Sequence, residues 1–183
     1  MHKAIFIDRD GTVSEEVGYM YHAGLFRPFP WTGAAIRRIN ESGMKAVLTT
    51  NQSGIERGYF SEDIVLEVHG ILRDELSRWK AHLDAFYYCP HRPESGCNCR
   101  KPRTGMLFRA QQELDVDLGQ SFVIGDRYID VQMARAAGAK SVLVLTGDGR
   151  KELLEHGGNA VQPDHVAGDL LRAVEAILNG EVS

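Results

Sequence analysis

Short apolar runs alternate with amphipathic segments along this chain, and this alternation limits the possible folds more than any other feature. The apolar runs predict strands at 3–8, 44–51, 85–89, 121–126 and 140–147. The periodic segments predict helices at 32–43, 61–83, 104–114, 128–138 and 167–180. Strands separated by helices form a parallel sheet with helices on both faces. We therefore expect an α/β fold, a doubly wound parallel sheet, in a single domain that spans 1–183.

The bulk composition excludes several classes of protein. Hydrophobic residues make up 43% of the chain and charged residues 25%, and the net charge is −4. A nucleic-acid binder usually carries a basic face, and a membrane protein needs an apolar run of about 20 residues, which this sequence lacks. The N-terminal sequence MHKAIFIDRDGT contains no apolar segment of signal-peptide length. We expect a cytoplasmic monomer with neither a nucleic-acid nor a membrane partner.

Polar residues follow several of the predicted strands, where a parallel sheet binds its ligands. Asp8 and Asp10 follow the first strand in DRDGT, Thr50 ends the second in TTNQSG, and Asp126 ends the fourth. Each motif also has an ordinary interpretation, because Asp, Asn, Ser and Gly are typical of turns and Asp126 can cap a helix. Asp130 can simply complement the dipole of the following helix.

Taken together, these motifs place several carboxylates at neighbouring strand ends. Close carboxylates repel one another unless a cation or a shared proton intervenes. A hard cation such as Mg²⁺ prefers oxygen ligands and is usually held by a few carboxylates together with a substrate phosphate. A carboxylate beside it can then attack phosphorus and form an aspartyl-phosphate.

The motifs FIDRDGTV, LTTNQSG, RKP and VIGDRYIDV, in this order between residues 6 and 131, resemble the haloacid-dehalogenase superfamily of phosphatases. The resemblance extends to about the fifth strand and implies a Rossmann-like core; no segment is long enough for a large cap domain. It implies that Asp8 is the nucleophile, that Asp10 is the general acid and then the base, and that Thr50 and Lys101 hold the phosphoryl oxygens.

The same resemblance implies a set of metal ligands. Mg²⁺ would be bound by Asp8, the backbone carbonyl of Asp10, and Asp126. Asp130 would lie behind them and orient Lys101.

All three cysteines lie in CPHRPESGCNCRKP, residues 89–102, which also contains a histidine. The four candidate ligands are Cys89, His91, Cys97 and Cys99. Three thiolates and an imidazole complete a tetrahedral Zn²⁺ site and leave no open position for catalysis. The alternatives are a redox pair, which would usually have C-x-x-C spacing, a disulfide, which is rare in the cytosol, and chance clustering. We expect a structural zinc loop that ends in Arg100 and Lys101.

This loop also resembles the zinc-containing branch of the superfamily, which has two activities. One removes the 7-phosphate of D-glycero-D-manno-heptose 1,7-bisphosphate in nucleotide-heptose synthesis, and the other hydrolyses histidinol phosphate. TNQSGIERGYF and EEVGY resemble the heptose enzyme more closely, although Glu16 and Val17 replace an expected aspartate and histidine and Arg127 replaces a lysine. We expect a small sugar phosphate as substrate, the heptose bisphosphate, with histidinol phosphate as the alternative.

A substrate with a second phosphate requires positive charge away from the reacting phosphate, and the planar guanidinium of arginine can bind phosphate through two hydrogen bonds. The segment 12–31 lacks periodicity and is expected to form a loop over the site. The expected substrate contacts are Glu16, Tyr19, Asn51, Gln52, Ser53, Arg57, Arg100 and Arg127. The segment 147–166 is expected to be a surface helix and loop without chemistry, and His69 is expected at the surface.

Two hypotheses of other classes follow from the same residues. A phospho-accepting receiver domain also has acidic residues at strand ends, but a second acid two residues after the phosphoacceptor favours turnover over storage of the phosphate. A zinc-knuckle nucleic-acid module would fit the cysteine loop, but the negative net charge disfavours it.

Overall fold

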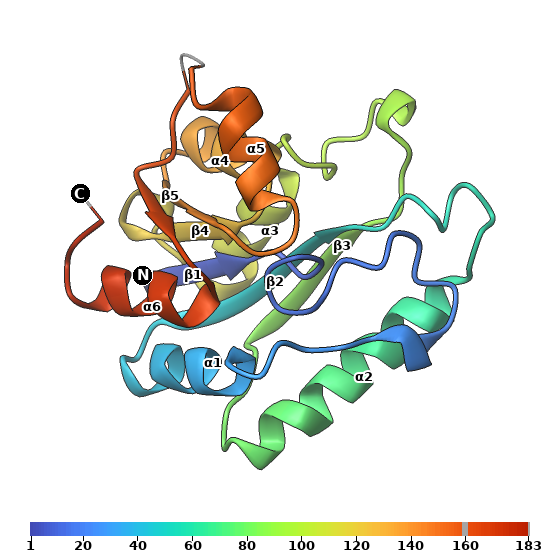
Figure 1. Ribbon diagram of the computed structural model, residues 1–183, viewed down its shortest axis with the longest axis horizontal. Helices are drawn as coiled ribbons and strands as arrows, with labels where there is room; N and C mark the ends of the chain where they lie inside the picture. The colour runs from blue at the N-terminus through green and yellow to red at the C-terminus, as the bar shows by residue number, and fades with distance from the viewer. Residues whose placement is uncertain (159–160, 183) are drawn as a thin grey trace.

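Six parallel strands form one sheet in the order β3-β2-β1-β4-β5-β6 (Figure 1). The structure is a computed structural model that describes residues 1–158 and 161–182. The strands are β1 (Ala4–Ile7), β2 (Lys45–Asn51), β3 (Ala85–Cys89), β4 (Phe122–Gly125), β5 (Lys140–Val144) and β6 (His165–Ala167). The predicted doubly wound parallel sheet is confirmed, and the described residues contain no large cap domain.

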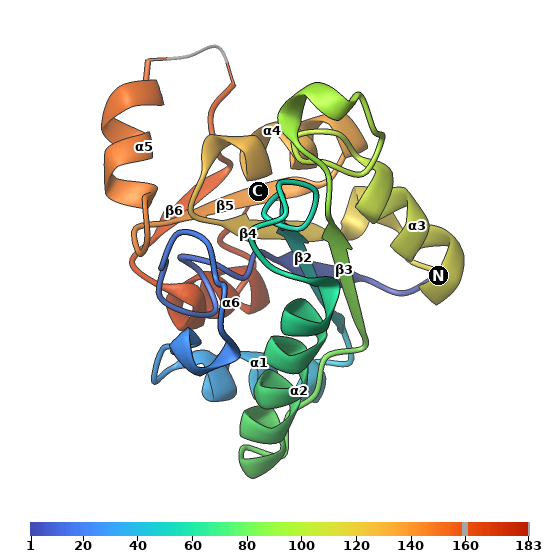
Figure 2. The same cartoon turned by 90° about the vertical axis from the view of Figure 1, so that its right-hand side faces the viewer.

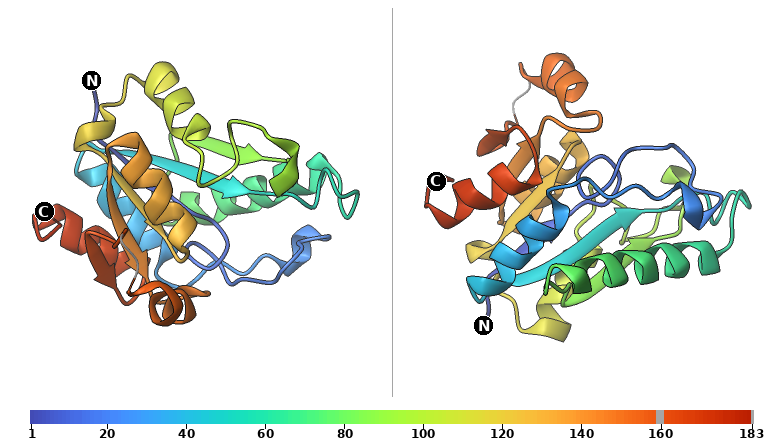
Figure 3. Two further views of the ribbon diagram at one scale, coloured as in Figure 1. Left: turned by 90° about the horizontal axis from the view of Figure 1, so that it is seen from above. Right: turned by 60° about the horizontal axis from the view of Figure 1, so that its bottom comes forward.

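Helices cover both faces of the sheet (Figures 2 and 3). One face carries α1 (Thr32–Glu41), α2 (Glu62–Arg78) and α6 (Leu170–Leu178). The opposite face carries α3 (Gly105–Leu114), α4 (Tyr128–Ala137) and α5 (Gly149–His156). Within the described residues, no helix is long and apolar enough to cross a membrane.

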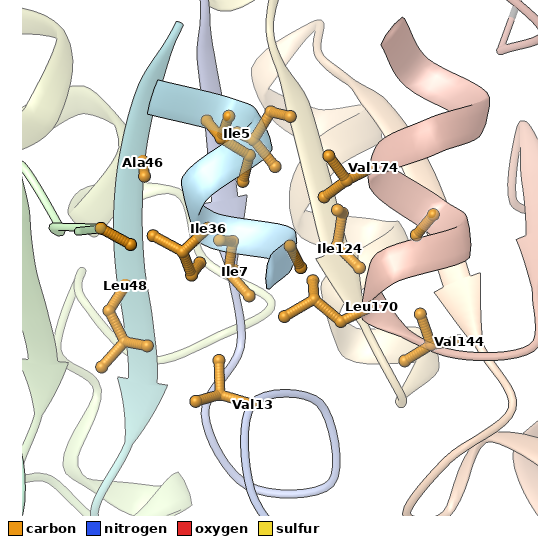
Figure 4. Close-up of a cluster of buried hydrophobic side chains, with 14 of the residues drawn as sticks. Ile5, Ile7, Val13, Ile36, Ala46, Leu48, Ile124, Val144, Leu170 and Val174 are labelled. Atoms are coloured by element: carbon orange, nitrogen blue, oxygen red, sulfur yellow. The ribbon is translucent and has the colours of Figure 1, made fainter. Parts of the chain in front are cut away.

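The first strand shows why its sequence is apolar throughout. Ile5 and Ile7 pack against the helices on one face, whereas Ala4 and Phe6 pack against the helices on the other. Successive side chains of a strand point to opposite faces, so a strand that is covered on both sides needs apolar residues at every position. Figure 4 shows Ile7 within the first of these clusters, with Ile36 from α1 and Leu170 from α6.

Two elements differ most from the prediction. Strand β6 was expected to be loop; it pairs with β5 from His165 to Ala167 and extends the sheet by one strand. A strand of three residues is too short to show the sequence pattern by which strands are predicted. Helix α2 ends at Arg78 instead of residue 83, and Lys80 beyond it has a positive φ of 53°. The helix α5 lies in the segment 147–166 as expected, while residues 159 and 160 of that segment lie outside the described part of the chain.

His69 was wrongly expected at the surface. It lies on the inner side of α2, is 2% exposed, and packs against Phe86 with ring centroids 4.8 Å apart. Burial, with the nearby guanidinium groups of Arg9 and Arg73, lowers the pKa of His69 to about 3. The imidazole is therefore a neutral core residue.

The strand order locates the site. The chain builds outward from β1 in one direction through β2 and β3, and in the other through β4, β5 and β6. Ligands in such sheets bind at this point of reversal, outside the carboxyl ends of the strands. Asp8 directly follows β1, and Asp126 directly follows the neighbouring strand β4.

The packing between α6 and the sheet can be tested with two leucines. Leu170 on α6 is fully buried, whereas Leu154 on α5 is 86% exposed. We expect Leu170→Ala to lower the free energy of unfolding by about 2–5 kcal/mol, because the lost methyl groups leave a cavity. Leu154→Ala, the matched control, should change it by less than about 0.5 kcal/mol. Urea denaturation measures both, and equal effects would contradict the packing described.

Candidate active site

A cavity of about 330 Å³ opens beside the carboxyl ends of the central strands. Its lining brings together most residues that the sequence singled out: Asp8, Asp10, Glu16, Tyr19, Thr50, Asn51, Gln52, Ser53, Arg57, Arg100, Lys101, Arg127 and Asp130. The predicted ligand Asp126 is fully buried beneath the cavity. Asp148 and Phe60 also line the cavity and were not predicted. Asp148 lies in the segment 147–166, which was expected to be a surface helix and loop, and Phe60 ends the motif TNQSGIERGYF, in which only polar residues were assigned contacts.

A buried lysine connects two of the carboxylates. The Nζ atom of Lys101 donates to Oδ1 of Asp8 and to Oδ1 of Asp130, each at 2.7 Å. Burial acts to lower the pKa of Lys101, but the carboxylates of Asp130 and Asp8 outweigh it and raise the pKa above its ordinary value. Lys101 therefore stays charged in a site where it is only 3% exposed.

The carboxylates of Asp8, Asp126 and Asp130 form one cluster, with an oxygen atom of each within 4.8 Å of the others. Burial, together with the other aspartates, raises the pKa of Asp8 to about 7 and that of Asp126 to about 9. One oxygen of Asp126 accepts a hydrogen bond from the backbone N–H of Asp148 at 2.8 Å.

Two carboxylate oxygens in this cluster have no partner. Among the described residues, Oδ1 of Asp126 and Oδ2 of Asp130 are buried and receive no hydrogen bond. Buried polar atoms are normally paired, and hard cations prefer carboxylate oxygens. The cluster therefore fits a divalent cation such as Mg²⁺.

Glycines allow the carboxylates to pack this closely. Gly11 has a positive φ of 80°, and a Cβ atom there would lie 2.1 Å from Oδ2 of Asp126. A Cβ atom on Gly125 would lie 2.3 Å from Cγ of Asp130. Any side chain at either position would displace a carboxylate, which explains why glycine follows Asp10 in DRDGT and precedes Asp126 in VIGD.

Asp10 is held by side chains from two strand ends. Arg9 donates from Nε and Nη2 to Oδ1 of Asp10 at 3.0 and 2.9 Å, and from Nη2 to Oδ2 at 2.8 Å. Gln52 donates to Oδ2 at 2.9 Å, and the Thr50 hydroxyl lies 3.5 Å from the same oxygen. This role of Arg9 was not predicted from the sequence, because an arginine between two aspartates in a turn is normally exposed.

Asn51 fixes the backbone of the site lysine. Its Oδ1 accepts from the backbone N–H of Lys101 at 3.1 Å, and its Nδ2 donates to the carbonyl of Lys101 at 3.3 Å. Although Asn51 lines the cavity as expected, both ends of its amide are occupied by the loop that carries Lys101.

The cysteine loop brings its four candidate ligands together. Each of Cys89, His91, Cys97 and Cys99 contributes an atom to a group within 4.8 Å. The cysteines are free, with 3.0 Å between the sulfur atoms of Cys89 and Cys99. Burial would raise the pKa of Cys97, but hydrogen bonds, foremost from the backbone N–H of Arg100, lower it to about 7. Sulfur and imidazole ligands in a compact group fit a zinc ion.

Further contacts connect this loop to the neighbouring loop 52–60. The carbonyl of Cys89 accepts from the backbone N–H of Gln52 at 2.7 Å. The carboxylate of Glu56 accepts from the hydroxyl of Ser95 at 2.5 Å and from the backbone N–H of Arg92. The cysteine loop therefore supports part of the cavity wall as well as Lys101.

The mouth of the cavity carries most of the remaining expected contacts. Arg100 donates to the carbonyl of His91 at 3.1 Å, and Arg127 is half exposed, 3.9 Å from Glu152. Glu16 accepts from the backbone N–H of Gly18 at 2.6 Å. Burial and the nearby Asp10 raise the pKa of Glu16. Both cationic and acidic groups thus line the opening.

Two exposed aromatic rings meet beside the same opening. Tyr19 from the segment 12–31 and Tyr59 from the loop 52–60 make an edge-to-face contact with ring centroids 4.7 Å apart. Since Tyr19 lines the cavity, the two loops meet at its edge.

Known proteins resemble the whole chain. D-glycero-D-manno-heptose-1,7-bisphosphate 7-phosphatase of Thermosynechococcus vestitus is 41% identical over 95% of this chain and 94% of its own length. D-glycero-beta-D-manno-heptose-1,7-bisphosphate 7-phosphatase of Haemophilus influenzae is 42% identical over 80% of this chain and 84% of its own length.

A solved structure shows the same similarity. The crystal structure of D,D-heptose 1,7-bisphosphate phosphatase from B. bronchiseptica, complexed with magnesium and phosphate, superposes with a TM-score of 0.90. It is 35% identical and covers 97% of this chain and 99% of its own. The HAD-hydrolase-like family model matches residues 98–173. The chain therefore belongs to the HAD-like hydrolases and, among them, to the family of the D-glycero-D-manno-heptose-1,7-bisphosphate 7-phosphatases.

Proposed function

We propose that this phosphomonoester hydrolase removes the 7-phosphate of D-glycero-D-manno-heptose 1,7-bisphosphate through an aspartyl-phosphate, with Mg²⁺ as cofactor. One observation carries the proposal: a buried lysine binds Asp8 at the bottom of a cavity lined with arginines, beside carboxylate oxygens that lack partners. The relatives named above, including the one solved with magnesium and phosphate, support this choice of substrate and cation.

Asp8 is the proposed nucleophile. Lys101 binds its Oδ1, which leaves Oδ2 free to attack phosphorus. Lys101 and the hydroxyl of Thr50 would contact the phosphoryl oxygens, where they offset the negative charge of the transition state. Asp130 holds Lys101 from the opposite side at 2.7 Å and so sets the direction of its ammonium group.

Asp10 is the proposed acid and base. It donates a proton to the departing 7-oxygen of the sugar, and it then accepts a proton from the water that hydrolyses the aspartyl-phosphate. Its position in the cavity lining, two residues after Asp8, suits both steps.

The proposed Mg²⁺ ligands are Asp8, Asp126 and the backbone carbonyl of Asp10. When bound, the ion supplies positive charge that offsets the carboxylates and the transferring phosphoryl group. The raised pKa values of Asp8 and Asp126 support this assignment, because burial and the neighbouring aspartates both disfavour the charged carboxylates, and a cation would offset both effects.

The cysteine loop is the proposed structural zinc site. Cys89, His91, Cys97 and Cys99 would occupy all four positions of a tetrahedral zinc ion, so this metal would take no part in the chemistry. Its effect would reach the reaction through Lys101, which lies two residues after Cys99.

Substrate selection is assigned to the mouth of the cavity. Arg57, Arg100 and Arg127 would bind the second phosphate, and Glu16, Tyr19, Gln52 and Ser53 would contact the sugar. The names of the relatives favour the heptose bisphosphate over histidinol phosphate, and membership of a phosphatase family leaves no support for a receiver domain. A monomeric state and a cytoplasmic location remain part of the proposal.

The choice of substrate can be tested directly. We expect kcat/KM for release of phosphate from the heptose bisphosphate to exceed that from histidinol phosphate by at least about 10-fold, because the second phosphate adds charged contacts. Asp8→Asn, the control, should fold normally and release no phosphate. A preference for histidinol phosphate would overturn the substrate assignment, and turnover by Asp8→Asn would overturn the nucleophile.

Removing one crowded carboxylate should stabilise the protein while abolishing its response to magnesium. Without a cation, the carboxyl of Asp126 favours the protonated form, so its contribution to stability becomes more unfavourable as the pH rises from about 4 to about 9. Without magnesium, Asp126→Asn should therefore raise Tm by about 2–4 °C, and more at pH 8 than at pH 5. Magnesium should raise Tm of the wild type but not that of Asp126→Asn. Asp74→Asn, an exposed change on α2, should behave as the wild type. A lower Tm for Asp126→Asn than for the wild type would contradict the repulsion among the buried carboxylates.

The structural zinc site predicts a different pattern. Purified protein should contain about one zinc ion per chain, and His91→Ala should lower the zinc content, Tm and kcat together because the loop then no longer fixes Lys101. His82→Ala, which changes an exposed histidine, is the matched control. Zinc analysis and phosphate release measure these effects. Full activity in zinc-free His91→Ala protein would show that the loop needs no metal.

A further inference from the structure

Arg9 is a buried charged side chain that the proposed chemistry does not use. It lies between Asp8 and Asp10 in the sequence, it is 1% exposed, and it is among the largest fully buried side chains of the protein. A buried guanidinium group is costly unless it is paired and hydrogen-bonded. The structure must therefore supply a partner for it.

That partner is Asp10. Nε and Nη2 of Arg9 both donate to Oδ1 of Asp10, and Nη2 also donates to Oδ2, at 2.8–3.0 Å. Within the residues that the structure describes, this is the ion pair that Arg9 makes. His69 lies nearby, and its lowered pKa keeps the imidazole neutral, so it adds no second positive charge beside Arg9.

The contact determines how the carboxyl group of Asp10 lies. A single hydrogen bond leaves a carboxyl group free to turn, whereas a planar guanidinium group that contacts both oxygens fixes its plane. Gln52 adds a hydrogen bond to Oδ2 at 2.9 Å from the end of β2. Asp10 itself remains partly exposed to the cavity, with 17% of its side chain accessible.

The backbone of Arg9 serves a separate purpose. Its carbonyl accepts from the N–H groups of Thr12, Val13 and Ser14 at 2.9–3.3 Å and so closes the turn after β1. These hydrogen bonds do not involve the side chain. A change of the side chain can therefore test the position of Asp10 while the turn is retained.

We propose that Arg9 is a positioning residue that holds Asp10 for its two proton transfers, protonation of the departing alcohol and activation of the hydrolytic water. This inference rests on the proposed function of Asp10. Arg9 is not among the described residues that line the cavity. If Arg9 acts through Asp10 alone, a change of Arg9 should slow only those steps in which Asp10 transfers a proton.

The test varies the leaving group. An alkyl phosphate, such as the heptose bisphosphate, requires protonation of its alcohol, whereas an activated aryl phosphate such as p-nitrophenyl phosphate releases a stable anion without it. For Arg9→Lys we expect kcat/KM to fall at least about 10-fold with the alkyl ester and less than about 3-fold with the aryl ester, because general acid catalysis contributes about 10²–10⁴-fold. With the aryl ester, a burst of phenolate should precede slower turnover, because hydrolysis of the aspartyl-phosphate still needs Asp10.

A double-mutant cycle with Asp10→Asn tests whether Arg9 acts through Asp10. Once Asp10 cannot transfer a proton, the further change Arg9→Lys should lower the remaining activity less than about 2-fold, because coupled residues are not additive. Arg9→Gln, which is shorter and uncharged, gives an independent second variant if Arg9→Lys folds poorly. Tm and the response to magnesium show whether each variant retains its fold and its cation site.

Three outcomes would overturn the inference. One is an equal loss with both esters, which indicates a general structural role. Another is an additive loss in the Asp10→Asn background. The third is unchanged activity in both Arg9→Lys and Arg9→Gln. Wild-type protein that hydrolyses neither ester would overturn the proposed function as well, so the two failures can be distinguished.

Discussion

The contacts of Lys101 with Asp8 and Asp130 are the interaction on which the rest of the site depends. Three carboxylates at the point of strand reversal would repel one another, and a buried ammonium group offsets part of that repulsion. Asp8 and Asp126 follow adjacent strands of the sheet, and Asp130 lies in the first turn of α4. The lysine is the one member of the group that comes from a long loop, so its position has to be secured by other means.

The contacts that hold Lys101 differ from those that hold the carboxylates. The amide of Asn51 at the end of β2 binds both the N–H and the carbonyl of Lys101, and the cysteine cluster ends two residues before it. The two clusters of candidate ligands also differ in chemistry: carboxylate oxygens suit a hard cation, whereas sulfur and imidazole suit zinc. Each cluster therefore fits a different metal, a hard cation among the carboxylates and zinc in the loop that carries the lysine.

The sequence predicts those features that depend on local pattern. Doubly buried strands are continuous apolar runs, and polar residues at their ends are visible because they interrupt those runs. Features that depend on tertiary packing were not visible. His69 and Arg9 are buried by segments distant in sequence, although isolated histidine and arginine residues are usually exposed. Strand β6 has three residues, and only its pairing with β5 identifies it. The motifs thus identified most of the polar groups that line the cavity, but not the buried arginine that binds Asp10.

The residues that would select the substrate lie in a different part of the fold from those that would carry out the chemistry. Two of the proposed magnesium ligands, Asp126 and the proposed nucleophile Asp8, lie directly after strands that are packed on both faces, where a change would disturb the core. By contrast, Glu16, Arg57 and Arg100 lie in three loops that meet around the opening of the cavity. Loops tolerate substitution better than the elements they connect. Substitutions such as Glu16, where the heptose enzymes are expected to have aspartate, can therefore alter the proposed contacts with the sugar while the proposed geometry of phosphoryl transfer stays unchanged.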